Sequence, residues 1–172
     1  DTGTTPMTNL SILRTCDCYA DLFKFTVVRH PISRFISAVN MFVRDGRLDA
    51  STAIKDTVHI MKTCESYTHW SPEPNLPSYI KRHTLPLTHT LYGIASGHAA
   101  LAVDYVLKLE DREEHWPEFL ALLGIPTTAV LPVTNATVSA VTTNHIEHDD
   151  LRFLLQYYEH DFTLFDYLKH PC

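Results

Sequence analysis

Apolar and polar residues follow one another along this chain in stretches typical of strands that lead into helices. Residues 23–28 are aromatic and β-branched, which predicts a buried strand. Pro31 suits the first turn of a helix, and the Asp45-Gly46 pair predicts where that helix ends. The apolar positions between them recur at helical spacing and predict one buried face: Ile32, Phe35, Ile36, Val39 and Val43. The opposite face is predicted to carry a polar stripe: Ser33, Ser37, Asn40 and Arg44.

The next third of the chain predicts one more helix and a long connection. Residues 50–64 form a second amphipathic pattern, with Ile54, Val58 and Met61 on its inner side. Residues 71–87 contain four prolines and predict a long irregular connection, a kind of segment that often carries function.

The last third predicts a second strand and two more helices. The strand covers residues 104–109 and leads into a helix over 112–123, which Gly124 ends. Residues 126–144 are predicted to be loop or extended chain. A helix over 145–160 and a short aromatic segment over 162–167 close the pattern.

This order predicts a single α/β domain over residues 1–172, with a short parallel sheet flanked by helices. The 172 residues can bury a sizeable core, and 45% hydrophobic with 20% charged residues is an ordinary globular composition. The formal net charge of −6 argues against a nucleic-acid partner.

Targeting and cysteine signals suggest a secretory compartment. No apolar run reaches the roughly 18 residues that cross a bilayer, so we expect membrane attachment only through an anchor outside this chain. Asn9 and Asn135 each begin a glycosylation sequon. The cysteines lack zinc-finger spacing and predict core thiols or disulfides rather than a metal site: Cys16, Cys18, Cys64 and Cys172.

The strand and helix that meet at Arg29 form a candidate anion site. A helix that starts directly after a strand leaves backbone N–H groups and the positive end of its dipole free for a phosphate. Arg29 lies at the turn, where a guanidinium can bind a phosphate through two hydrogen bonds. Arg34 and Ser37 are three residues apart and are therefore neighbours on the helix surface.

Residues 25–38, which read FTVVRHPISRFISA, resemble the 3′-phosphate-binding motif of sulfotransferases that use 3′-phosphoadenosine 5′-phosphosulfate (PAPS). The resemblance implies that Arg29 and Ser37 bind the 3′-phosphate of PAPS. It also implies a P-loop-type, sulfotransferase-like nucleotide-binding fold.

Weaker matches follow in the order found in Golgi carbohydrate sulfotransferases, so that the resemblance covers about residues 23–168. They are His69-Trp70 with Pro72, residues 105–111, residues 123–125 with Leu131-Pro132 and Asn135, and finally Tyr158, Asp161-Phe162, Phe165 and Tyr167. The resemblance implies a glycan or other carbohydrate acceptor, and a Golgi-lumenal location as part of a type II membrane protein.

The family's upstream loop, a Lys-containing Gly-Thr-rich turn that grips the 5′-phosphosulfate, has no clear counterpart here. Residues 2–5 read TGTT, lack the lysine and have no strand before them. A strand–helix–strand unit needs roughly 30 residues, and fewer precede Arg29. We therefore expect a fold that is incomplete at its N-terminus, with the loop either upstream of Asp1 in the complete protein or lost.

In the implied reaction a sugar hydroxyl attacks the sulfur of PAPS, with no metal, and His69 is our candidate for the base. Residues 81–83, a Lys-Arg-His cluster, either meet an anionic glycan or form a solvated surface. Two alternatives remain. The first is a non-catalytic, degenerate sulfotransferase-like domain that binds nucleotide or glycan. The second is a histidine phosphatase, whose Arg-His-Gly start Arg29-His30 resembles, with Pro31 in place of the glycine.

Overall fold

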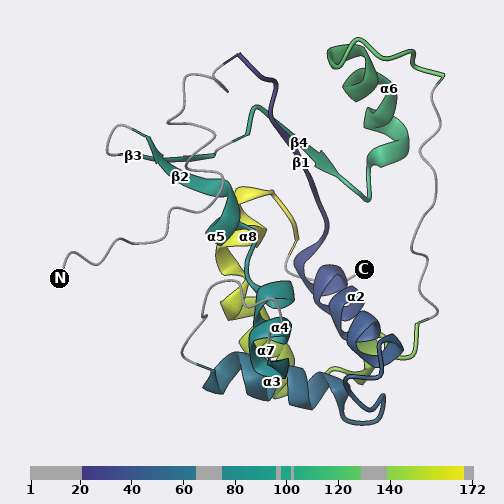
Figure 1. Ribbon diagram of the computed structural model, residues 1–172, viewed down its shortest axis with the longest axis vertical. Helices are drawn as coiled ribbons and strands as arrows, with labels where there is room; N and C mark the ends of the chain where they lie inside the picture. Colours follow the sequence, from purple (N-terminus) through teal and green to yellow (C-terminus); the bar gives the residue numbers. More distant parts are fainter. Residues whose placement is uncertain (1–20, 65–74, 96–97, 102, 129–138, 169–172) are drawn as a thin grey trace. The chain divides into compact units, whose positions relative to one another are not determined.

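The computed structural model describes residues 21–64, 75–95, 98–101, 103–128 and 139–168 (Figure 1). Contacts divide the chain into two compact units. The first contains residues 1–29 and 87–131, and the second contains residues 30–86 and 132–172. All strands of the described residues belong to the first unit.

The first unit is built on a two-stranded parallel sheet. Strand β1 (Phe25–Val28) pairs with β4 (Tyr105–Lys108), with Phe25 opposite Tyr105 and Val28 opposite Lys108. Helix α6 (Arg112–Leu122) follows β4 (Figure 1). The ring centroids of Phe25 in β1 and Phe119 in α6 lie 4.7 Å apart. The predicted short parallel sheet with a flanking helix is therefore confirmed.

The prediction that β1 is buried along its length is wrong. Val28 is buried, but Phe25 and Val27 remain 45% and 47% exposed. Because alternate residues of a strand share a face, these two side chains lie on the same side of the sheet. One helix of 11 residues packed on a two-stranded sheet leaves much of that side uncovered.

The first unit also contains an antiparallel hairpin that the sequence pattern did not predict. The short helix α5 (Thr88–Leu91) leads into strand β2 (Tyr92–Ala95), which pairs with β3 (His98–Leu101). At the other end of this unit, Gly124 follows α6 with a positive φ of 68° and confirms the predicted helix stop.

The second unit is helical. It contains α2 (Pro31–Arg44), α3 (Ala53–Thr63), α4 (Leu76–Thr84), a 3-10 helix (Thr143–His145), α7 (His148–Tyr157) and α8 (Glu159–Leu164). The buried faces of α2, α3, α7 and α8 meet, together with Val141, in one core: Ile32, Phe35, Val39, Ala53, Ile54, Val58, Met61, Val141, Leu154, Tyr158 and Phe162. The inward positions predicted for the helix that starts at Pro31 and for the helix over 50–64 are confirmed, with Ile36 and Val43 packed at the edge of this core. The second of these helices is shorter than predicted and covers Ala53–Thr63.

Helix α4 lies where the sequence predicted a long irregular connection. The prolines of residues 71–87 misled the prediction, because one of them, Pro77, lies in the first turn of α4, where proline is tolerated. Asn75 caps this helix, and its Oδ1 accepts a hydrogen bond from the Ser78 amide at 3.0 Å. Ile80 is buried against Phe42 and Ala38 of α2 in a second apolar cluster.

Asn40 was predicted to lie on a polar stripe, and the structure shows that it is buried. Its Oδ1 accepts hydrogen bonds from the amides of Ala140 and Val141 at 2.7 and 2.9 Å. Its Nδ2 donates to the carbonyls of Val141 and Ile36 at 2.9 and 3.0 Å. Four hydrogen bonds offset the cost of burying the amide, and they fix residues 140–141 to α2.

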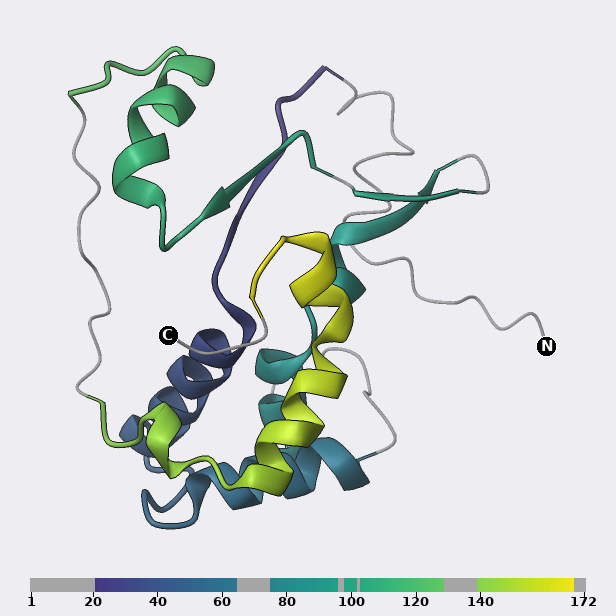
Figure 2. The same cartoon turned by 180° about the vertical axis from the view of Figure 1, so that it is seen from behind.

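The helix predicted over 145–160 is divided in two. Helices α7 and α8 follow one another along the chain and are separated at Tyr158, whose backbone leaves the helical conformation (Figure 2). The predicted aromatic segment begins inside α8, because Phe162 is helical and buried.

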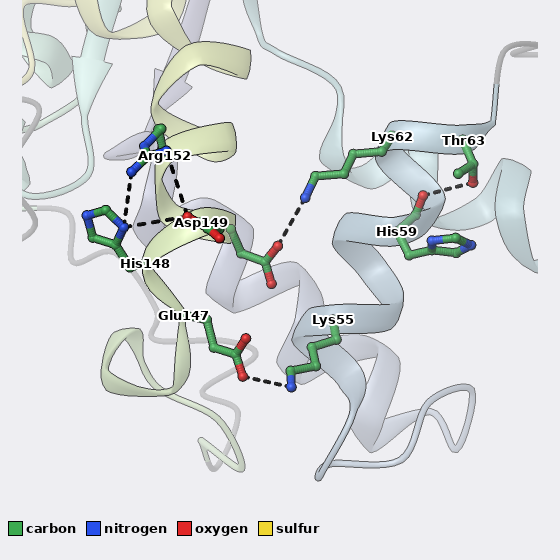
Figure 3. A network of polar contacts seen from close by, with 9 residues as sticks. Lys55, His59, Lys62, Thr63, Glu147, His148, Asp149 and Arg152 are labelled. Atoms are coloured by element: carbon green, nitrogen blue, oxygen red, sulfur yellow. Dashed lines mark hydrogen bonds and ion pairs between the residues drawn. The ribbon is translucent and has the colours of Figure 1, made fainter.

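Exposed ion pairs join α3 to α7 at the surface of the second unit (Figure 3). Lys55 pairs with Glu147 at 2.7 Å, and Lys62 pairs with Asp150 at 3.1 Å. The neighbouring carboxylate of Glu147 raises the pKa of Lys55. Exposed pairs of this kind contribute little to stability, so the apolar core holds these helices together.

Candidate functional site

The first turn of α2 offers backbone donors for an anion. His30 occupies the N-cap position but makes no side-chain capping hydrogen bond, and Pro31 has no N–H. The Arg34 amide donates to the His30 carbonyl at 2.9 Å and makes the first bond of the helix. The amides of Ile32 and Ser33 therefore precede that bond and are the donors that a phosphate at a helix N-terminus uses.

His30 anchors the start of this helix to the C-terminal segment. It is 9% exposed, and its Nε2 donates to the Leu168 carbonyl at 3.1 Å. Its ring lies edge-on to the rings of Phe162 and Tyr167, each at 5.4 Å between centroids. A histidine that becomes phosphorylated must be open to its substrate, so this burial does not fit the phosphatase alternative.

The structure places the sequence-predicted site residues as follows. Arg29 directly follows β1 and is half-buried, and it forms no salt bridge with a carboxylate in the described part of its own unit. Ser37 is exposed on α2, about two turns after the helix begins. Arg29 belongs to the first unit and Ser37 to the second. His69 lies outside the described residues.

Arg34 has partners that the sequence did not reveal. Its Nη2 donates to the Leu85 carbonyl at 2.7 Å and lies 3.6 Å from the Asp161 carboxylate. The guanidinium carbon lies 5.2 Å from the centre of the Tyr158 ring. Arg34 thus joins α2 to the end of α4 and to α8, and it is not one of a row of surface donors beside Ser37.

Tyr158, which lies between α7 and α8, also contacts the end of α4. Its hydroxyl donates to the Thr84 carbonyl at 2.6 Å, and burial raises the pKa of Tyr158 far above its ordinary value. The phenol therefore remains a neutral donor over the whole physiological range. Tyr158 and Phe162 are both buried in the core of this unit. The sequence signal for these contacts was that Tyr158, Asp161 and Phe162 belong to the last of the weaker matches to the family.

The comparison with protein families supplies the assignment. The sulfotransferase family matches the chain over residues 5–168.

The chain belongs to the sulfotransferase family.

The family match starts at residue 5, whereas the resemblance noted in the sequence starts at about Phe23. Both end at residue 168. The searches of curated proteins and of solved structures returned no match. The predicted resemblance is confirmed for the family as a whole, and the mixed α/β structure with its short parallel sheet agrees with a sulfotransferase-like fold.

Proposed function

We propose that this sulfotransferase-family chain transfers the sulfuryl group of PAPS to a hydroxyl group of a carbohydrate. The observation that supports the proposal is the motif over residues 25–38, within a family match that covers residues 5–168. In the structure this motif contains a strand that ends just before Arg29 and a helix that begins just after it, at Pro31.

The donors of this segment suit a terminal phosphate. In the proposal the Arg29 guanidinium and the Ser37 hydroxyl bind the 3′-phosphate of PAPS. The amides of Ile32 and Ser33 and the positive end of the α2 dipole add favourable charge. Arg34 supports this site indirectly, since its contacts with Leu85 and Asp161 hold the first turns of α2 in place.

The proposed reaction is a direct transfer. The acceptor oxygen forms a bond to the sulfur of PAPS, and the bond from sulfur to the phosphate oxygen breaks. The nucleotide leaves as 3′-phosphoadenosine 5′-phosphate. We propose His69 as the base that takes the proton of the acceptor hydroxyl, because a histidine titrates close to neutral pH.

We further propose that the protein acts in the Golgi lumen as part of a type II membrane protein. The sequons at Asn9 and Asn135 and the order of the weaker motifs support this location. Within the described ranges, no helix has the length and apolar character needed to cross a bilayer.

Calorimetry with two nucleotides tests the proposed phosphate site. We expect the protein to bind 3′-phosphoadenosine 5′-phosphate more tightly than adenosine 5′-phosphate by about ten- to a hundredfold, because charge-assisted hydrogen bonds contribute about 1.5–3 kcal/mol. Arg29→Ala should abolish the difference, and Ser37→Ala should reduce it.

Arg44→Ala is the matched control for this titration. Arg44 is an exposed arginine in the last turn of α2 and pairs with Asp45, so its loss should leave the preference intact. Equal affinity of the wild type for the two nucleotides would contradict a 3′-phosphate site at Arg29.

A further inference from the structure

Helix α4 and the end of α2 carry a cluster of cations around one aromatic ring, which we call the Tyr79 patch. It consists of Tyr79, Arg47, Arg82 and His83. The guanidinium carbons of Arg47 and Arg82 lie 3.9 and 5.7 Å from the centre of the Tyr79 ring. The His83 ring lies 4.6 Å from the same ring. The sequence had indicated only the Lys-Arg-His run over residues 81–83.

The helices hold this patch in a defined geometry. Arg82 and His83 lie three and four residues after Tyr79, and therefore on the same side of α4. Arg47 follows Gly46, whose φ of 66° turns the chain, and the Arg47 amide donates to the Phe42 carbonyl at 2.9 Å. Phe42 is fully buried and packs edge-on against Tyr79 at 5.7 Å.

The positive charges of the patch come from the guanidinium groups of Arg47 and Arg82. Among the described residues, neither Arg47 nor Arg82 forms a salt bridge with a carboxylate. The Asp45 carboxylate lies close enough to raise the pKa of His83, but it pairs with Arg44. Two guanidinium groups at one ring repel each other, and stacking on the ring leaves their N–H edges able to bind an oxyanion.

His83 reports on the charge state of this patch. Burial lowers the pKa of His83, the charges of Arg82 and Arg47 lower it further, and Asp45 opposes them. The imidazole is therefore neutral in the free protein at neutral pH. An anion bound between the guanidinium groups would favour the imidazolium and raise this pKa.

We propose that the Tyr79 patch binds a sulfate or carboxylate group of an acidic carbohydrate. The anionic charge of the ligand follows from the two guanidinium groups, and a bound anion would favour the imidazolium form of His83 beside them. The choice of a carbohydrate rests on the function proposed above, and it makes the acceptor of that reaction an acidic glycan.

The test uses the whole protein with a chondroitin sulfate hexasaccharide, and with inorganic sulfate, neutral cellohexaose and hexaglutamate as comparison ligands. Calorimetry gives the affinities, and NMR titration of the His83 ring gives its pKa. We expect the sulfated hexasaccharide to bind more tightly than the other three and to raise the pKa of His83. Since the bound state then favours the imidazolium, the affinity for the hexasaccharide should increase as the pH falls through the pKa that His83 has in the complex.

Single-charge variants locate the binding. Arg47→Gln and Arg82→Gln should each weaken binding of the sulfated hexasaccharide about tenfold, and each should raise the pKa of His83 in the free protein because a positive neighbour is lost. Arg152→Gln, an exposed arginine of α7, should change neither quantity. Binding that is absent, or that is unchanged in both patch variants, would overturn the site. Equally tight binding of hexaglutamate would overturn the choice of a carbohydrate.

The nucleotide titration separates this proposal from the proposed function. Arg47→Gln and Arg82→Gln should retain the wild-type preference for the bisphosphate nucleotide. If that preference stands and the hexasaccharide does not bind, the patch proposal alone is wrong. If the hexasaccharide binds at the patch and the wild type lacks the nucleotide preference, the anion site stands and the sulfuryl-transfer proposal falls.

Discussion

Arg34 and Asn40 show what a helical pattern can and cannot predict about a single residue. The sequence shows both as polar residues of one helix, and in the structure both bind partners within the second unit. Asn40 bonds to Val141, which lies 101 residues further along the chain. Spacing along a helix predicts which side chains share a face, but it does not reveal a partner that only the tertiary fold brings near.

The pair of Arg34 and Asp161 should be important for stability. Asp161 is 1% exposed, and Asp161→Asn would leave the largely buried guanidinium without its carboxylate. Breaking one side of a buried ion pair costs about 3–5 kcal/mol, and partial exposure of Arg34 reduces that figure. We expect a loss of about 2–3 kcal/mol of unfolding free energy, measured by urea denaturation.

Asp149→Asn provides the comparison for this substitution. Asp149 is an exposed acid of α7 that pairs with Arg152 at 3.8 Å, so its replacement should change the unfolding free energy by less than about 1 kcal/mol. An Asp161→Asn protein as stable as Asp149→Asn would show that Arg34 does not depend on its carboxylate partner.

At the scale of elements, continuous apolar patterns were predicted well and proline-rich ones were not. Strands β1 and β4 and helices α2, α3 and α6 lie where the pattern placed them, and α2 and α3 each present one apolar face to a core. Helix α4 was missed because its proline and polar residues hide a single buried apolar position, Ile80. The β2–β3 hairpin was missed because residues 92–101 lack the alternation that indicates a strand.

The cap of α4 can be tested separately from its packing. Asn75→Ala removes the acceptor for the Ser78 amide and should cost about 1 kcal/mol of unfolding free energy. Asn75→Asp retains a capping oxygen and should stay close to the wild type. Thermal unfolding of the three proteins side by side measures both effects. Equal destabilisation by the two substitutions would contradict a capping role.

At the scale of the whole molecule, the sequence predicted the sulfotransferase family and the α/β class, and both are confirmed. That success depended on Arg29, Pro31 and Ser37 standing at fixed distances in one short segment, so that no tertiary contact was needed to recognise them. The single-domain organisation, the roles of Arg29 and Ser37 and the use of His69 remain predictions. They depend on how distant segments meet around a bound nucleotide, which local patterns do not encode.

The sulfuryl transfer that we propose for this chain can be measured itself. The protein is incubated with PAPS that carries radioactive sulfur and with a mixture of cell-surface glycans, and the label on the glycans is counted. We expect label on the glycans with the wild type and at least about tenfold less with Arg29→Ala when PAPS is below saturation. If the protein binds the bisphosphate nucleotide and still leaves no more label than heat-denatured protein does, the chain is a non-catalytic relative and the claim is wrong.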